Sequence, residues 1–265
     1  MSILRKITKK IASLQGLTNL SKKIALDVEI ARGNLNDIFP SDFTENEKLN
    51  VAAVRSFTMT SPERLVALSR GIDYLVQNNV GGDIVECGVW KGGSMLLVAR
   101  KLVQLKDENR NLFLFDTFEG MSDPGSEDVS AVDQSTAKDL LNAFDKTEGD
   151  NVWCYSPLEE VKANLAKSGY PSGKISFIKG KVEDTLPEPS IGTIALLRLD
   201  TDWYESTRHE LETLYDKLTP GGVLIIDDYG HWSGSRKAVD EFMAKRKLKL
   251  FLHRIDYTGR MAIKM

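Results

Sequence analysis

The stretch IALLRLDTDWYEST, residues 194–207, decides the fold class. In it an apolar run ends in two carboxylates, Asp200 and Asp202. A second stretch, GGVLIIDDYGHW at residues 221–232, also ends an apolar run in two acids, Asp227 and Asp228. Short apolar runs of this kind are typical of the buried strands of a parallel sheet. If the two strands are neighbours, their carboxylates converge on one crevice beyond the carboxyl ends of the strands.

Strand-like and helix-like segments alternate around these two stretches. The pattern predicts strands at 83–87, 111–116, 175–179, 193–200 and 222–227, and helices at 58–79, 93–106, 157–167, 205–217 and 235–246. Residues 248–265 predict two further strands around a turn that contains Gly259. This order predicts an α/β fold with a doubly wound, largely parallel sheet, helices on both faces and right-handed connections.

Length and composition limit the class of protein. The chain of 265 residues suits one large α/β domain, or one such domain with a helical appendage. Its net charge of −3 argues against a surface that wraps nucleic acid. No apolar run is long enough to span a membrane, and the N-terminus lacks the apolar core of a signal peptide. Cys87 and Cys154 lie in no metal-ligand spacing, so we expect free thiols and a cytoplasmic location.

The first 25 residues differ from the rest of the chain. They place Ile3, Leu4, Ile7, Ile11 and Leu14 at helical spacing, with basic residues between them. The segment is interpreted either as a helix that binds a membrane surface or a partner, or as an appendage packed on its own domain or on a second subunit. We therefore expect an N-terminal helical extension over residues 1–55 and the main domain over 56–265. A homo-oligomer formed through the N-terminal helices stays open.

A glycine-containing turn follows the first predicted strand. The stretch DIVECGVWKGGS, residues 83–94, has the pattern ExGxxxGGS and lacks the full GxGxxG motif of dinucleotide sites. Gly88 would let a ligand approach the backbone, and Gly93 would help open the next helix. Glu86 lies where a carboxylate can take an ammonium group, and Ser94 can donate a hydrogen bond. The turn favours a cationic or zwitterionic ligand, with a purely structural turn as the alternative.

The second predicted strand ends in Asp116, within LFLFDTFEGM. An acid at this place can accept hydrogen bonds from both ribose hydroxyls of a nucleoside, and Phe118 could cover the adenine. The alternative is that Asp116 only caps a helix. Glycines after the first strand together with an acid after the second are typical of nucleoside sites.

The four acids at the two later strands need positive charge nearby. Arg198 lies two residues before Asp200 and can supply it as an ion pair. The alternative is a hard cation such as magnesium, which carboxylate oxygens bind well.

Several blocks, in the order TMTSPERL, VECGVWKGGS, LFLFDTFEGM, LLRLDTDWYEST and GGVLIIDDYGHWSGSRKAVDEF, resemble the macrocin O-methyltransferase family over roughly residues 55–245. The resemblance implies a class I methyltransferase fold, with a seven-stranded Rossmann-like sheet whose last strand is antiparallel. It also implies an enzyme that depends on S-adenosylmethionine and magnesium and methylates a sugar hydroxyl. The acceptor would be a glycosylated natural product, a nucleotide sugar or a polysaccharide.

The resemblance also implies roles for single residues. Those that would bind or border the cofactor are Met59, Thr60, Ser61, Glu86, Gly88, Ser94, Asp116, Gly180 and Val182. Asp200, Asp227 and Asp228 would bind magnesium. For the general base we consider Asp200 and Asp202 first, with His231 as a further candidate.

Three other functions stay open. A metal-dependent methyltransferase of a catechol-like phenol would use the same chemistry on adjacent hydroxyls. A nicotinamide-dependent oxidoreductase would need the GxGxxG motif that this chain lacks. A non-catalytic S-adenosylmethionine-binding or scaffold module would work through its basic N-terminal helix.

Overall fold

The sheet has seven strands in the order β3-β2-β1-β4-β5-β7-β6. Their bounds are β1 Asp83–Cys87, β2 Leu112–Asp116, β3 Ile175–Lys179, β4 Ile194–Leu199, β5 Leu218–Ile226, β6 His253–Arg254 and β7 Arg260–Ile263. Strands β1 to β5 pair in parallel, whereas β7 is antiparallel to both β5 and β6. The predicted seven-stranded sheet with an antiparallel last strand is therefore confirmed.

The computed structural model describes residues 39–147 and 149–265. The helix predicted within residues 1–25 lies outside the described residues, as does most of the predicted extension over 1–55. A unit rich in internal contacts spans Ala53–Met265 and contains the whole sheet. In the described part of the chain, no helix has the length and apolar character needed to cross a membrane.

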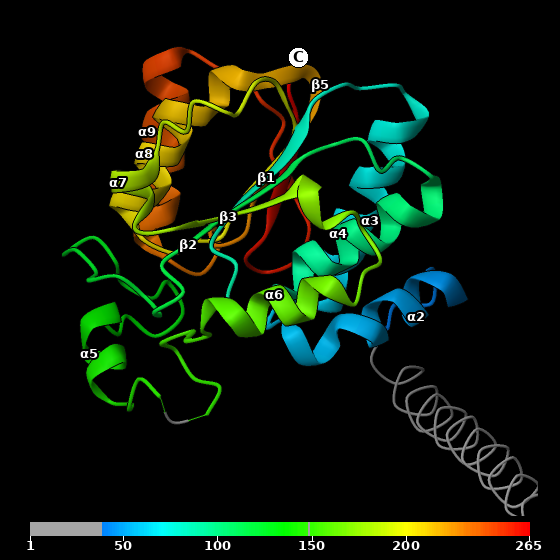
Figure 1. The fold of residues 1–265 in the computed structure, drawn as a ribbon. Helices are drawn as coiled ribbons and strands as arrows, with labels where there is room; N and C mark the ends of the chain where they lie inside the picture. The colour runs from blue at the N-terminus through cyan, green and yellow to red at the C-terminus, as the bar shows by residue number, and fades with distance from the viewer. Residues whose placement is uncertain (1–38, 148) are drawn as a thin grey trace, which may run out of the picture. The chain divides into compact units, whose positions relative to one another are not determined.

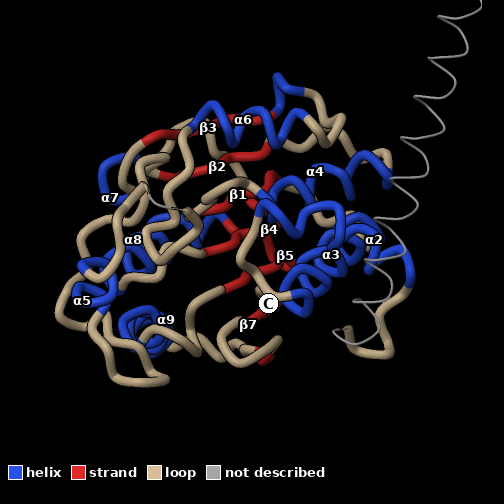
Figure 2. The backbone as a smooth tube through the Cα atoms, turned by 90° about the horizontal axis from the view of Figure 1, so that it is seen from below, coloured by secondary structure: helices blue, strands red, loops and turns tan. Residues whose placement is uncertain are grey.

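Helices cover both faces of the sheet (Figure 1). One face carries α3 (Pro62–Gln77), α4 (Gly93–Leu105) and α6 (Leu158–Ala166), and the other carries α7 (Val182–Thr185), α8 (Tyr204–Leu214) and α9 (Ser233–Arg246). The remaining helical segments are α2 (Glu45–Val54), α5 (Ala137–Asn142) and the 3₁₀ turns η1 (Arg55–Phe57), η2 (Ser172–Lys174) and η3 (Tyr215–Lys217). Figure 2 shows the strands as the central layer, with β3 toward one end of the sheet and β7 toward the other.

The packing of the core explains why the sequences of the later strands are continuous apolar runs. Every residue of β4 is buried, because helices lie on both faces of the sheet. Leu211 and Leu214 of α8 and Phe242 of α9 pack against β4 and β5 in one apolar cluster. The register then places the ends of β1, β4 and β5 in one row, where the Asp200 amide donates to the carbonyl of Cys87.

Three elements differ from the sequence-based expectation. Strand β5 begins at Leu218 rather than at residue 222, because Gly221 and Gly222 pair with the backbone of Lys264. Helix α5 forms within the long stretch after β2 to which the sequence pattern assigned no element. Strand β6 is only two residues long, because the apolar residues before it form no ladder.

Candidate functional site

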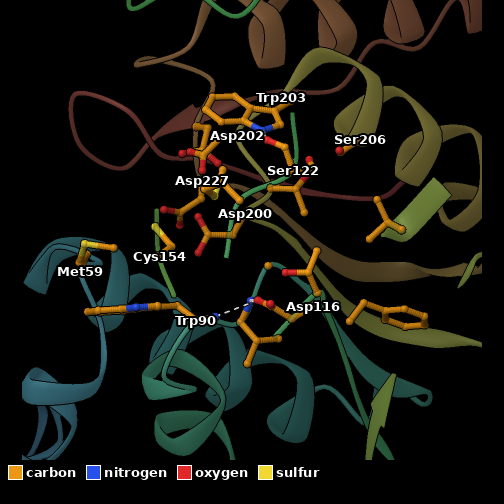
Figure 3. A pocket seen from close by; sticks show the side chains of 18 of the residues that line it. Met59, Trp90, Asp116, Ser122, Cys154, Asp200, Asp202, Trp203, Ser206 and Asp227 are labelled. Atoms are coloured by element: carbon orange, nitrogen blue, oxygen red, sulfur yellow. Dashed lines mark hydrogen bonds between the residues drawn. The ribbon is translucent and has the colours of Figure 1, made fainter. Parts of the chain in front are cut away.

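A pocket of about 330 Å³ lies at the carboxyl ends of β1, β2, β4 and β5. Figure 3 shows Asp200, Asp202 and Asp227 on one side of it and Asp116 with Trp90 on another. The pocket is therefore formed where an open parallel sheet is expected to bind its ligand.

The predicted carboxylate cluster forms on β4 and β5. Asp200, Asp227 and Asp228 each place an oxygen within 4.8 Å of the other two. Asp202 lies beside them with a backbone φ of +67° and shares a hydrogen bond with Asp228. The structure therefore brings together the four acids that the two strand ends predicted.

Arg198 lies beneath this cluster, buried near the carboxyl end of β4. Its guanidinium lies 2.6 Å from Glu86 Oε1, 2.8 Å from Asp200 Oδ2 and 2.7 Å from Asp227 Oδ1. It also donates to Thr60 Oγ1 at 3.0 Å. One buried cation thus joins β1, β4, β5 and the segment before α3, so the predicted ion pair exists alongside the acid cluster.

Arg64 provides a second cation from the first turn of α3. Its side chain pairs with the other carboxylate oxygen of Asp227, and its Nε lies 3.0 Å from Asp256 Oδ2. Ser61 caps α3 and donates to the same oxygen of Asp256 at 2.7 Å. The turn between β6 and β7 is thereby attached to the site, and Tyr257 from this turn lines the pocket.

More carboxyl groups than basic groups lie in this cluster, and the pKa values of three of these carboxyl groups are raised. Burial raises the pKa of Asp228 to about 7, with the charge of Asp200 as the next cause. Burial and the neighbouring Asp228 raise the pKa of Asp202 well above its ordinary value. Burial also raises the pKa of Glu86 to about 8, against the lowering effect of Arg198. The site therefore has more buried carboxyl groups than its own cations keep in the charged form.

Asp116 at the end of β2 is held by backbone amides. Its Oδ2 accepts from the N–H groups of Val89 at 2.7 Å and Trp90 at 3.0 Å, and its Oδ1 accepts from Phe118 at 2.6 Å. Asp116 therefore fixes the glycine turn after β1 as well as lining the pocket. Gly88 in that turn has φ +82°, and a Cβ there would lie 1.9 Å from the carbonyl oxygen of Asp200, so only glycine fits.

Most of the predicted cofactor residues line the pocket: Met59, Thr60, Gly88, Ser94, Asp116, Gly180 and Val182. Ser61, Glu86, Gly93 and Phe118 lie behind its wall. Glu86 is fully buried, and within the described chain its Oε2 has no hydrogen-bond partner. Phe118 is buried and packs against Phe177. The cofactor-binding roles of these residues stay predictions.

His231 lies at the pocket wall instead of facing solvent. Its ring is half-buried between Trp232 and Tyr257, and in the described residues its Nδ1 has no hydrogen-bond partner. Burial lowers the pKa of His231, which favours the neutral ring. His231 is thus available as a hydrogen-bonding group in the pocket.

The stretch after β2, residues 119–136, is long, acidic and rich in small residues, which predicts a mobile lid over the acceptor, and in the structure it is folded against the pocket. Trp203 donates its indole N–H to the carbonyl of Ser122 at 3.0 Å. Asp128, almost fully buried, accepts from the amide of Tyr204 at the start of α8 at 2.8 Å. Trp203 and Trp232 pack edge to face and form a small apolar cluster with α5. Whether this segment opens for the acceptor stays a prediction.

Sequence reasoning missed several residues of the pocket. Arg64 and Tyr257 are remote from the strand ends in sequence and give no local signal. Trp90 lies within the glycine turn, which is the one sequence feature that could have identified it, and its backbone φ of +47° is known only from the structure. Cys154 also lines the pocket, from a loop with no recognisable pattern.

Comparisons with known proteins agree with this geometry. The chain matches the family model described as macrocin-O-methyltransferase (TylF) over residues 29–263. It is 36% identical over 202 residues to the 8-demethyl-8-(2,3-dimethoxy-alpha-L-rhamnosyl)-tetracenomycin-C 4'-O-methyltransferase of Streptomyces olivaceus, which covers 76% of this chain and 73% of that protein. It is also 36% identical over 203 residues to the demethyldecarbamoylnovobiocin O-methyltransferase of Streptomyces niveus, with the same coverage.

A solved structure extends the match to the fold. The O-methyltransferase NovP superposes with a TM-score of 0.70 at 29% identity, covering 92% of this chain and 99% of NovP. The family model spans most of the chain, including the pocket and the acid cluster. The protein belongs to the macrocin O-methyltransferase family and is an S-adenosylmethionine-dependent O-methyltransferase.

Proposed function

We propose that this methyltransferase methylates a sugar hydroxyl and uses magnesium held by Asp200, Asp227 and Asp228. The observation that carries the proposal is the cluster of these three carboxylates at the wall of the pocket. The two Streptomyces relatives support the acceptor class, because the name of the Streptomyces olivaceus enzyme describes an acceptor that carries a rhamnosyl group. A glycosylated natural product, a nucleotide sugar and a polysaccharide are the acceptors to compare.

The residues present fit a hard divalent cation. Carboxylate oxygens are the ligands that magnesium prefers in proteins. Burial and then the charge of Asp200 raise the pKa of Asp228, and Arg64 and Arg198 offset these two effects only in part. Arg198 and Arg64 also pair with Asp227 from two sides, which fixes the direction of its carboxylate. When bound, the cation would lower the pKa of an acceptor hydroxyl.

The cofactor would occupy the part of the pocket between the glycine turn and Asp116. Gly88 gives the backbone room for close approach, and Asp116 can still accept from ribose hydroxyls at its free lone pairs. Met59 and Thr60 would border the methionine end of the cofactor. These groups position the sulfonium methyl toward the acid cluster, and positioning supplies much of the rate of such a transfer.

We assign Asp202 as the general base, acting in its ionised form, which a cation held by the cluster would favour by offsetting the neighbouring charges of Asp228 and Asp200. It lies next to the cluster and shares a hydrogen bond with Asp228, whereas Asp200 is paired with Arg198. The acceptor hydroxyl transfers its proton to the Asp202 carboxylate as its oxygen forms a bond with the methyl carbon. The carbon–sulfur bond breaks, its electron pair stays on sulfur, and neutral S-adenosylhomocysteine leaves. Trp203 and Trp232 close one wall with apolar surface and keep water from competing as acceptor.

The test combines metal removal with two substitutions. Turnover is measured by mass spectrometry on the three acceptor classes, with magnesium and with EDTA. We expect loss in EDTA, and a fall of at least about 100-fold in kcat for Asp227→Asn and Asp228→Asn, since loss of a ligand should exceed the usual effect of an outer-shell partner. Asp240→Asn is the matched control, because Asp240 lies on α9 and hydrogen-bonds to the hydroxyl of Tyr229.

Calorimetry with S-adenosylhomocysteine separates binding from chemistry. We expect each cluster variant to bind it within about threefold of the unaltered protein, since Asp116 and the glycine turn are unchanged. Full activity of either cluster variant, or full activity in EDTA, would contradict the metal role. Turnover of a catechol but of no sugar would contradict the acceptor class.

A further inference from the structure

A short segment between α9 and β6 has two chemically different sides. Residues 247–253 begin with Lys247, the C-cap of α9 with a φ of +52°, and from Leu248 on they alternate with a period of two, as an extended chain does. The inward side chains pack against the apolar cluster of α8 and α9: Leu248, Leu250 and Leu252. The outward side chains are exposed: Lys247, Lys249, Phe251 and His253. We call this segment the edge strap, because it leads into β6 at the end of the sheet.

The outward side of the edge strap is apolar at its centre. Phe251 is 82% exposed, the largest exposed fraction of any aromatic side chain among the described residues, and its ring lies 6.2 Å from that of His253. His253 pairs across the hairpin with Met261, so Ile263, two residues further along β7, lies on the same face. Ile263 is also exposed, at 42%. Apolar side chains grouped in water in this way mark a contact surface.

The charges around Phe251 are positive and unpaired. At the end of α9, Lys245 pairs with Glu212 and Arg246 pairs with Asp216. By contrast, Lys247 and Lys249 form no ion pair with any carboxylate in the described part of the chain. The net charge of the whole protein is −3, so this local excess of cations is a feature of the segment and not of the surface in general.

We propose that the edge strap docks on an anionic lipid membrane. A lone aromatic ring that follows two lysines suits a bilayer interface, because the ring can enter the acyl boundary while the ammonium groups stay among the anionic headgroups. A second copy of the chain is a poorer occupant, since a twofold contact would bring the lysines of both copies together. The first 25 residues have the same combination of apolar and basic residues, and they are kept in the experiment.

The test is co-sedimentation of the full chain with lipid vesicles. Phosphatidylcholine vesicles are compared with vesicles that contain about 30% phosphatidylglycerol, at low and at physiological salt. We expect binding to the anionic vesicles only, weakened by salt. Phe251→Ser should lower the partition coefficient by about tenfold, which is the size of effect expected for one aromatic side chain. The double variant Lys247→Glu with Lys249→Glu should lower it by at least about tenfold.

Matched controls decide whether the strap itself is responsible. Phe144→Ser removes another exposed aromatic residue, at 53% exposure, and Lys138→Glu reverses an exposed lysine on α5. Both controls should bind vesicles like the unaltered protein, and all variants should keep their thermal midpoint and their affinity for S-adenosylhomocysteine. Absence of vesicle binding would overturn the proposal. So would binding that the strap variants leave unchanged, since the N-terminal residues would then account for it.

Discussion

Asp116 and Asp227 both close a strand at the pocket, yet the chain holds them in different ways. Asp116, at the end of β2, accepts three backbone N–H groups. Asp227, directly after β5, is held by two arginines, one from β4 and one from α3. Backbone amides satisfy a carboxylate with neutral dipoles, whereas arginines bring full charges with desolvation costs of their own.

The difference separates two tasks within one pocket. The amides around Asp116 belong to the glycine turn and to the start of the following loop, so this acid fixes the shape of the backbone. The arginines at Asp227 balance charge in a crowded group of acids. We therefore expect changes at Asp116 to alter cofactor affinity, and changes around Asp227 to alter stability and turnover.

The largest effect is expected from Arg198→Met. Methionine keeps much of the volume but leaves Glu86 buried without its cation and Asp227 with Arg64 alone. Removal of one partner from a buried ion pair costs about 3–5 kcal/mol of unfolding free energy. Urea unfolding followed by circular dichroism measures it.

Arg64→Met is the matched comparison for the same acid. After this change Asp227 keeps Arg198, and Arg64 itself is partly accessible, so we expect a smaller loss of about 1–2 kcal/mol. Equal losses in the two variants would show that the position of the arginine in the sheet does not matter. A larger loss for Arg64→Met would reverse the comparison.

A pair of isosteric changes, Asp116→Asn and Asp227→Asn, tests the division of tasks directly. An asparagine at 116 presents an NH₂ group to amides that need an acceptor. We expect Asp116→Asn to weaken S-adenosylhomocysteine binding by about tenfold while kcat at saturating cofactor stays within about threefold. Asp227→Asn should show the opposite pattern. If both variants lose affinity and keep kcat, the two acids share one task.

The sequence predicted the sheet well because its strands are buried on both faces. Continuous apolar runs such as that of β4 leave few alternatives to a parallel sheet. The start of β5 was wrong by four residues, since Pro220 and Gly221 resemble a turn and only tertiary pairing, of Leu218 with Ile194 of β4 and of Gly221 and Gly222 with Lys264, extends the strand. Helix α5 was missed because six residues give too little periodicity.

The site was predictable where it follows from strand ends, and not where it depends on tertiary contacts. Asp200, Asp227 and Asp228 converge because neighbouring parallel strands end at one edge. The second cation on Asp227 comes from α3, and it meets Asp256 from a turn 192 residues away along the chain. No local pattern links these segments, so only the fold could reveal that the C-terminal turn completes the pocket.

A change that appears only as pH varies is expected at Glu86, the acid on the far side of Arg198. Its pKa is raised by burial to about 8 in the folded protein, above the ordinary value of 4.5. The folded state therefore binds more protons at Glu86 than the unfolded state between these two values, and the unfolding free energy falls as pH rises through this window. Glutamine cannot titrate, so Glu86→Gln should gain stability relative to the unaltered protein by about 1–3 kcal/mol between pH 5.5 and pH 8. Urea unfolding of both proteins at the two pH values measures the gain. If the difference in unfolding free energy between the two proteins is the same at both pH values, Arg198 keeps Glu86 ionised over this whole range. Arg198 would then stabilise the charge of Glu86 on β1 as strongly as it stabilises the charge of Asp227.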